Sequence, residues 1–427
     1  MKKRLGVFLL PSAATTPAEF DKGYAGKNPN YYQKALKENS ELIKQAEDLG
    51  FDFVAYSEHH FHVEGLEVSN NPVMLGAWAA GFTKRIRIGQ MGNVLPARNP
   101  ILLAEDLAML DHFSGGRMFA GFARGYQSRH VMTVGQKYNA IATFATDPDY
   151  KEHDQINREL FNENYKIIRG LWENPLFSHE GKHWTIPPAN VPWAHPGTLE
   201  MASGMTDEQG ILRKIGIAPT TLQDPKTIEI MIPFTMSPNT IRWAAGEGAW
   251  PIIFTPIHEN IIHSLNAYHE AALAANRDIK WGQNVGHFRE VIVADTDEEA
   301  FEIGSRSLGH VWTKWHDWFG FNEALRYPGE TGPIENTYKT MVDRGYSIVG
   351  SVDTVARKLE AFFNNYNADM LVLWIGSGPG PHDKLMRSNE LLVEKVLPKL
   401  GITLDTFTPT LRSEFEGPKW TESPGQG

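Results

Sequence analysis

The chain has 427 residues, of which 41% are hydrophobic and 11% aromatic, so it is long enough to bury a large core. Its net charge of -10 comes without a long basic stretch, which argues against nucleic acid as a partner and favours an acidic enzyme in solution. It contains no cysteine, which excludes disulfides and thiolate metal sites and suits the reducing cytoplasm. No apolar stretch approaches the roughly 20 residues of a membrane span, so we expect no membrane partner.

Strands and helices are predicted to alternate from the first residues onward. Short apolar runs indicate strands, and apolar residues at helical spacing indicate helices. The first predicted strands cover residues 5–10, 51–56, 85–89 and 118–123, and the first predicted helices cover residues 31–49, 72–82 and 100–113. Asn99 is the expected N-cap of the third helix. Alternation of this kind predicts a parallel sheet with crossover helices.

The same alternation returns after an irregular stretch over residues 125–153. A helix over residues 154–172, a hairpin turning at Gly181 and a proline-rich loop follow. The later predicted strands cover residues 228–234, 250–254, 286–294 and 369–374, and the later helices cover residues 239–246, 259–275, 351–363 and 384–397. Eight strands with helices between them predict an α/β fold, a closed (β/α)8 TIM barrel with inserted loops and helices. We expect a single domain over residues 1–400 and an arm or disordered tail over residues 401–427.

Two irregular segments are long enough to have a function of their own. Besides residues 125–153, we interpret residues 305–349 as an insertion that is rich in tryptophan and interrupted by proline. Loops of this length near a catalytic face commonly gate solvent, so we expect both segments to form a mobile lid. Trp312, Trp315 and Trp318 follow helical spacing and are expected to pack against a core, with a substrate-pocket wall as the alternative.

The densest group of titratable side chains directly follows the predicted strand over residues 51–56. Glu58, His59 and His60 leave that strand together. In a barrel the carboxyl ends of the strands form the catalytic face, so these residues are the first candidates for an active site. A metal cluster and a purely structural pair are the alternatives. We expect no metal, because adjacent imidazoles on an extended segment point to opposite sides and no third ligand is close in the sequence.

Further motifs follow one another along the predicted barrel. With Glu58-His59-His60-Phe61 they are Asn93-Val94-Leu95-Pro96, Ser114-Gly115-Gly116-Arg117, Gly121-Phe122-Ala123-Arg124-Gly125, Ser237-Pro238-Asn239-Thr240 and Val349-Gly350-Ser351. Together they resemble the bacterial luciferase-like, flavin-dependent monooxygenases, and ordered motifs are more specific than any single one. The resemblance extends from Leu5 to Leu400. It departs from the family around residues 127–153, 186–225 and 305–349, where members differ in substrate.

The resemblance implies a bound FMN and assigns catalytic residues to it. His59 would donate or accept a proton on a flavin C4a-peroxide, with Glu58 orienting the site and the share of His60 left open. The flavin ring would lie on the backbone at Met91 and Gly92, where the family often has a non-prolyl cis peptide bond.

The resemblance also implies a phosphate site and a substrate pocket. The phosphate would be bound by residues at strand ends and helix starts, namely Arg124, Gly125, Arg158, Ser237 and Thr240. Phe61 and Trp374 are candidates for the substrate pocket.

We therefore expect a two-component monooxygenase. It would receive reduced FMN from a separate flavin reductase and transfer one oxygen atom of O2 to a small, hydrophobic organic substrate. A deazaflavin-dependent oxidoreductase on the same barrel and a non-catalytic flavin-binding subunit are the alternatives, and the presence of His59 argues against the second. We expect a cytoplasmic homodimer that uses the helices over residues 72–82 and 100–113, as in the family.

Overall fold

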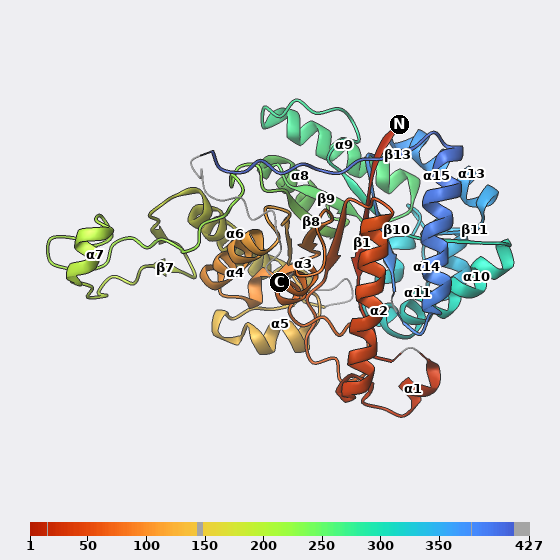
Figure 1. Ribbon diagram of the computed structural model, residues 1–427, viewed down its shortest axis with the longest axis horizontal. Helices are drawn as coiled ribbons and strands as arrows, with labels where there is room; N and C mark the ends of the chain where they lie inside the picture. Colours follow the sequence, from red (N-terminus) through yellow and green to blue (C-terminus); the bar gives the residue numbers. More distant parts are fainter. Residues whose placement is uncertain (15, 143–147, 377, 414–427) are drawn as a thin grey trace, which may run out of the picture. The chain divides into compact units, whose positions relative to one another are not determined.

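The computed structural model describes residues 1–14, 16–142, 148–376 and 378–413 (Figure 1). The chain divides into two compact units. The first contains residues 1–93, 119–122 and 229–408, and the second contains residues 94–118, 123–228 and 409–427. The single barrel domain expected over residues 1–400 stays a prediction. None of the helices in the described ranges combines the length and the apolar character of a membrane-crossing segment.

Parallel strands of the first unit form a nearly closed barrel. The barrel strands are β1 (Lys2–Leu9), β2 (Phe53–Tyr56), β3 (Arg87–Gln90), β5 (Ala120–Ala123), β8 (Ile230–Thr235), β9 (Trp250–Ile253), β10 (Gly286–Ala294) and β12 (Met370–Ile375). Their order in the sheet is β3-β2-β1-β12-β10-β9-β8-β5, followed by the short β4 (Asn93–Val94). The backbone N–H of Phe119 donates to the carbonyl oxygen of Ile88 at 3.1 Å, so the two edges of the sheet meet. The structure confirms the predicted TIM barrel and its strands.

The barrel forms because its strands are apolar on both faces. All six residues of β12 are buried, and Val7 on β1 lies in register with Val54 on β2 and with Leu373 on β12. Continuous apolar runs of this kind suit strands that are covered on both sides. Aromatic rings fill the interior, where Phe234 stacks on Phe288 with ring centroids 4.6 Å apart.

Helices connect the strands of the first unit, as predicted. They are α1 (Pro17–Asp21), α2 (Pro29–Asp48), α3 (Pro72–Ala80), α8 (Pro238–Glu247), α9 (His258–Ala274), α10 (Asp297–Arg306), α11 (Leu308–Val311), α12 (Tyr338–Asp343), α13 (Val352–Tyr366), α14 (His382–Leu391) and α15 (Leu397–Lys399). Local signals set their starts. The side chain of Thr296 accepts a hydrogen bond from the backbone N–H of Glu299 at 3.1 Å and so caps α10.

The prediction of an insertion over residues 305–349 is wrong at its end. There β11 (Ser347–Ser351) pairs in parallel with β10, from Glu290 opposite Ser347 to Ala294 opposite Ser351. The strand has only five residues, too few for its periodicity to be distinguished from that of a helix.

The prediction that three tryptophans of this segment face a core is also wrong for one of them. Trp312 is buried and Trp315 partly buried, whereas Trp318 is 82% exposed. The cause is a π turn (Trp312–His316) followed by a 3-10 turn (Asp317–Phe319). A π turn has more than 3.6 residues, so a spacing of three within it does not bring side chains onto one face.

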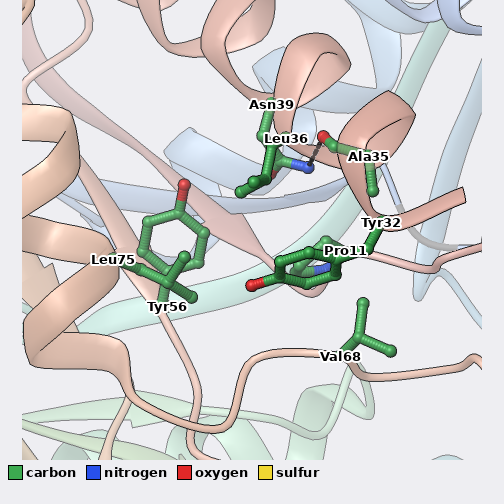
Figure 2. A pocket seen from close by; sticks show the side chains of 8 residues that line it. All are labelled: Pro11, Tyr32, Ala35, Leu36, Asn39, Tyr56, Val68 and Leu75. Atoms are coloured by element: carbon green, nitrogen blue, oxygen red, sulfur yellow. Dashed lines mark hydrogen bonds between the residues drawn. The ribbon is translucent and has the colours of Figure 1, made fainter. Parts of the chain in front are cut away.

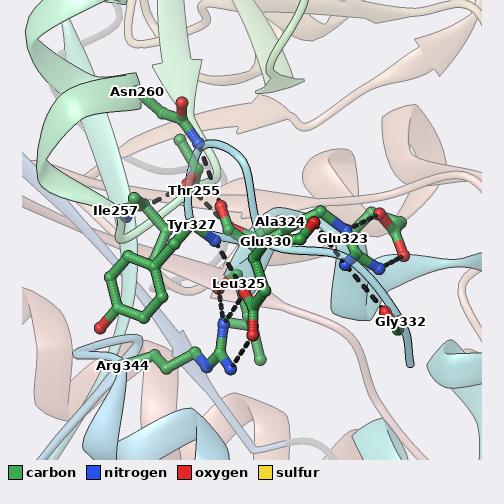
Figure 3. Close-up of polar contacts among 11 residues, drawn as sticks. Thr255, Ile257, Asn260, Glu323, Ala324, Leu325, Tyr327, Glu330, Gly332 and Arg344 are labelled. Carbon is green, nitrogen blue, oxygen red and sulfur yellow. Dashed lines mark hydrogen bonds and ion pairs between the residues drawn. The ribbon is translucent and has the colours of Figure 1, made fainter. Parts of the chain in front are cut away.

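Polar contacts give the middle of this segment a defined conformation (Figure 3). Arg344 forms an ion pair with Glu330 at 2.5 Å, and Arg326 forms one with Glu323 at 2.6 Å. The hydrogen bonds from Arg344 lower the pKa of Glu330 to about 2. The lid function stays a prediction, and residues 143–147 of the other predicted lid segment lie outside the described residues.

A fully buried acid, Glu290, lies where β10 and β11 pair. Its carboxyl group accepts hydrogen bonds from Ser347 Oγ at 2.6 Å and from the Tyr338 hydroxyl at 2.8 Å. Burial raises the pKa of Glu290, and the hydrogen bonds offset only part of this rise. The resulting pKa is about 7. The folded protein therefore holds the proton more tightly than the unfolded chain, in which the pKa is about 4.3. The stability contributed by this group is full below the unfolded pKa and is lost as the pH rises through about 7.

Glu290→Gln should therefore stabilise the protein at high pH only. The neutral amide replaces a carboxylate that is costly to bury, so we expect the free energy of unfolding to rise by about 2 kcal/mol at pH 8 and to change little at pH 5. Urea unfolding of the two proteins at both pH values measures the difference. A change of equal size at both would show that ionisation of Glu290 has no part in it.

Four charged side chains form a buried cluster at the amino ends of the barrel strands. Arg4 pairs with Asp52 at 2.6 Å and with Glu229 at 2.9 Å, and Arg87 pairs with Glu229 at 2.6 Å. The Arg87 guanidinium lies 4.4 Å from the ring centroid of Phe407, whose backbone N–H donates to Asp52 at 2.9 Å. Mutual pairing is what makes the burial of these charges tolerable.

The beginning of the predicted arm or tail has regular structure. In Figure 1 β13 (Thr403–Leu404) lies beside the N-terminus, and it pairs in parallel with β1, with Thr403 opposite Lys2. Residues 414–427 lie outside the described residues.

Helices dominate the second unit. They are α4 (Pro100–Phe113), α5 (Ser128–Val134), α6 (Tyr150–Glu173) and α7 (Pro196–Met201). Asn99 caps α4 as predicted, its side chain accepting hydrogen bonds from two backbone N–H groups. The antiparallel pair β6 (His179–Glu180) and β7 (Thr185–Ile186) confirms the predicted hairpin. The expectation of no element over residues 125–153 is wrong at α5, whose two buried residues, His130 and Val131, are too few to show a period.

Candidate active site

Strand β2 places the acid-histidine motif at the carboxyl end of the barrel. All four residues of β2 are buried, and the motif follows directly. Glu58 Oε1 lies 3.1 Å from His60 Nε2. His59 turns the other way, so that its Nδ1 lies 3.7 Å from Oε2 of Glu67. The two adjacent imidazoles thus face opposite sides, as expected for an extended segment, and each has its own carboxylate.

Glu67 is the centre of a buried polar cluster that the sequence did not reveal. Glu67 is 1% exposed, and its Oε2 accepts a hydrogen bond from Trp315 Nε1 at 2.8 Å. His62 Nε2 lies 3.4 Å from Oε2, and His316 Nε2 lies 3.7 Å from Oε1. Burial lowers the pKa of His316 to about 4, so this imidazole is neutral at physiological pH. Three imidazoles and an indole therefore surround one carboxylate.

The backbone at Met91 and Gly92 passes close to β5. The peptide bond between these two residues is cis, as the resemblance implied. A side chain on Gly92 would place its Cβ 2.8 Å from the backbone of Gly121 and Phe122, so only glycine fits. The N–H of Met91 donates to the carbonyl oxygen of Tyr56 at 2.7 Å, which connects this bend to the end of β2.

The amino end of α8 offers hydrogen-bond donors to an anion in the first unit. Ser237 is the N-cap residue of α8, and its hydroxyl makes no capping hydrogen bond. The Thr240 hydroxyl oxygen is buried and has no hydrogen-bond partner among the described residues. Backbone N–H groups at a helix start and a hydroxyl group suit a phosphate.

The two predicted phosphate arginines lie together in the second unit. Arg124 and Arg158 both form ion pairs with Asp154, the second at 2.9 Å. Burial would raise the pKa of Asp154, but the hydrogen bonds and charges of the two arginines outweigh it and lower the pKa. Gly125, next to Arg124, has φ 79°, which favours glycine. The two arginines carry two positive charges and Asp154 carries one negative charge, so the group of three has a net charge of +1.

The two predicted pocket residues occupy different surroundings in the first unit. Trp374 is 1% exposed and packs edge-on against Phe8, with ring centroids 5.3 Å apart, and against His316 at 5.2 Å. Phe61 is 47% exposed and has φ 66°. Their roles in binding substrate stay predictions.

A small hollow lies beside Tyr56, at the end of β2 (Figure 2). It is lined by Pro11, Tyr32, Ala35, Leu36, Asn39, Tyr56, Val68 and Leu75. Its volume of about 10 Å³ is that of a single water site, so it cannot bind a flavin or an organic substrate. The Tyr56 hydroxyl is buried without a hydrogen-bond partner among the described residues, and burial raises its pKa.

Residues 16–368 match the luciferase-like monooxygenases. The chain belongs to the luciferase-like monooxygenase family. A 3,6-diketocamphane 1,6-monooxygenase of Pseudomonas putida is 28% identical over 332 residues, covering 75% of this chain and 80% of that protein. The oxygenase component of a flavin-dependent trigonelline monooxygenase of Acinetobacter baylyi is 24% identical over 376 residues, covering 86% of this chain and 90% of that protein.

A solved structure of the family shares the fold. It is the oxygenating constituent of 3,6-diketocamphane monooxygenase from Pseudomonas putida, in complex with FMN. The TM-score is 0.66 at 22% identity, and the match covers 95% of this chain and all of that one. The family match and the two relatives named above confirm the expected enzyme class, a luciferase-like flavin-dependent monooxygenase.

Luciferase-like monooxygenases use a flavin, and each unit of this chain contains residues that suit its phosphate. In the first unit the start of α8 offers an uncapped serine and the unpartnered Thr240 hydroxyl to a phosphate. In the second unit Arg124 and Arg158 supply positive charge. The resemblance did not reveal His62, Glu67 and His316. Two of these lie within eight residues of His59, but no sequence pattern connects them to His316 on a distant turn.

Proposed function

We propose that this protein is the oxygenase component of a two-component monooxygenase. It would receive reduced FMN from a separate flavin reductase and use O2 to oxygenate a small, hydrophobic organic substrate. The observation that carries the proposal is His59, a nearly buried imidazole held toward the carboxylate of Glu67 at the carboxyl end of β2. Bound reduced FMN supplies two electrons, so that one oxygen atom of O2 enters the substrate and the other leaves as water.

The roles of the side chains follow from their chemistry. Arg124 and Arg158 of the second unit would offer charge to the FMN phosphate, and Ser237 and Thr240 of the first unit would offer hydrogen bonds to it. His59 holds or releases a proton at a ring nitrogen near neutral pH, and the buried Glu67 keeps its ring oriented. Glu58 keeps the ring of His60 oriented in the same way, with 3.1 Å between Glu58 Oε1 and His60 Nε2. The apolar barrel interior excludes water from the reaction.

Oxygen uptake tests the proposed activity against its alternatives. With reduced FMN and a panel of hydrophobic substrates, we expect O2 consumption coupled to products that are heavier by one oxygen atom in mass spectrometry. Tight binding of a deazaflavin, together with substrate oxidation that needs no O2, would favour the deazaflavin-dependent oxidoreductase. Binding of FMN without any turnover would favour the non-catalytic subunit. A cytoplasmic location is part of the proposal and is supported by the absence of cysteine.

We expect the protein to be a homodimer through α3 and α4. Large apolar side chains are exposed on both helices, with Met74 68%, Leu102 58% and Phe113 58% exposed. Exposed apolar side chains that form one continuous patch often mark a protein-protein interface. Sedimentation at micromolar concentration should give a dimer, and Phe113→Lys should shift it toward the monomer. A monomeric wild-type protein would contradict this expectation.

A further inference from the structure

We propose that His59, His62, Glu67 and His316 bind a divalent transition-metal cation of the zinc class. The four side chains belong to the first unit, and all of them are buried. The proposal goes beyond the flavin-dependent activity, because it depends on no contact with flavin or substrate.

The distances between the ligand atoms suit such an ion. Ligand atoms of His59, His62 and Glu67 all lie within 4.8 Å of one another. The Glu67 carboxylate lies 3.7 Å from His59 Nδ1 and 3.4 Å from His62 Nε2. Ligands at about 2.0–2.1 Å from a tetrahedral ion are roughly 3.4 Å from one another. A cation therefore fits between these atoms after only small shifts of the side chains.

His316 supplies a fourth ligand. Its Nε2 lies 3.7 Å from the other carboxylate oxygen of Glu67, and neither of its ring nitrogens has a hydrogen-bond partner among the described residues. A neutral imidazole offers one in-plane lone pair to a metal, and His316 Nε2 is the ring nitrogen that lies toward Glu67. The residue ends a π turn (Trp312–His316), a feature that is frequent at functional sites.

The carboxylate at the centre of the cluster has the features of a metal ligand. Glu67 is 1% exposed, and its carboxylate would supply the negative charge that a divalent cation needs in a buried site. The indole N–H of Trp315 donates to Glu67 at 2.8 Å, which is the kind of outer contact that orients metal-binding carboxylates. A cation on His59 Nδ1 would leave the proton on Nε2 in place, so the proton transfer proposed for His59 would need the metal-free state.

Titration of the metal-stripped protein with Co2+ tests the site. We expect one equivalent to bind with the intense visible absorption of four-coordinate cobalt, and Zn2+ to displace it. Glu67→Gln and His316→Gln should each raise the Kd for Co2+ by about 100-fold or more. Mutation of a residue that merely contacts a metal ligand already lowers the metal affinity by roughly 10- to 100-fold. His382→Gln is the control. It removes an imidazole of the same unit that faces Glu41 at 3.0 Å, and it should leave the Kd unchanged.

A second measurement covers variants that fail to fold. Glu67→Gln keeps an oxygen that accepts the hydrogen bond from Trp315, and circular dichroism checks its fold. For the wild-type protein, Zn2+ that binds only the folded state must raise the Tm. The proposal is overturned if Co2+ does not bind and Zn2+ leaves the Tm unchanged, if both ligand variants bind Co2+ as tightly as the wild type, or if His382→Gln weakens binding equally. Because no flavin or substrate is present, a failed monooxygenase assay has no bearing on these results.

Discussion

Replacing His59 by alanine should lower turnover by about a hundred- to ten-thousand-fold while reduced FMN still binds. Removal of a group that transfers a proton slows the chemical step. The residues proposed for the phosphate, Arg124, Ser237 and Thr240, lie on other elements and are untouched. The fold should persist, because Glu67 keeps the hydrogen bond from Trp315 when one imidazole is lost.

Two further variants separate the roles of the side chains. Arg124→Ala should raise the Kd for reduced FMN and recover most of its product formation at saturating flavin, because losing a phosphate contact mainly weakens binding. His60→Ala tests the other half of the motif, in which the imidazole faces Glu58. Product yield and flavin binding are measured for all three proteins. If turnover is unchanged in His59→Ala and falls in His60→Ala, then His60 and not His59 is the residue that transfers the proton.

Glu229→Ala should lower the free energy of unfolding by about 3–5 kcal/mol. The change removes the carboxylate that pairs with Arg4 at 2.9 Å and with Arg87 at 2.6 Å. Among the described residues, Asp52 would then be the one carboxylate that still pairs with both buried guanidinium groups. Breaking a buried ion pair from one side is costly because the partner charge stays buried.

The matched control is the same substitution on the surface. Glu302 lies 3.7 Å from Arg306, and both side chains are more than half exposed, so Glu302→Ala should cost at most about 1 kcal/mol. Urea unfolding compares the two variants with the wild type. If Glu229→Ala loses no more stability than Glu302→Ala, the cluster at the amino ends of the strands is not the buried network described above.

The barrel could be predicted because its signals are local. A buried parallel strand such as β12 is a run of apolar residues, and a helix start such as that of α4 follows Asn99. Elements with few buried residues could not be predicted. β11 has five residues and α5 has two buried side chains, so neither contains a full period of its pattern.

The candidate site could be predicted only where neighbours in sequence are neighbours in space. The opposite orientation of His59 and His60 follows from the pleat of an extended chain. The cluster around Glu67 could not be predicted in the same way. Its partner His316 comes from a π turn after β10, and Glu67 itself has φ 51°, a conformation that nothing in the sequence signals for a glutamate.

The buried charges at the amino ends of the strands have a consequence for how the protein is synthesised. Arg4, Asp52 and Arg87 leave the ribosome early, two cations with one anion, whereas Glu229 emerges much later and Phe407 later still. Until Glu229 arrives, the first three barrel strands cannot close over these charges without leaving one cation unpaired. The apolar strands that are synthesised first therefore stay exposed to solvent until Glu229 has been translated. Nascent chains in this condition aggregate readily, and we expect the yield of folded protein to depend on chaperones.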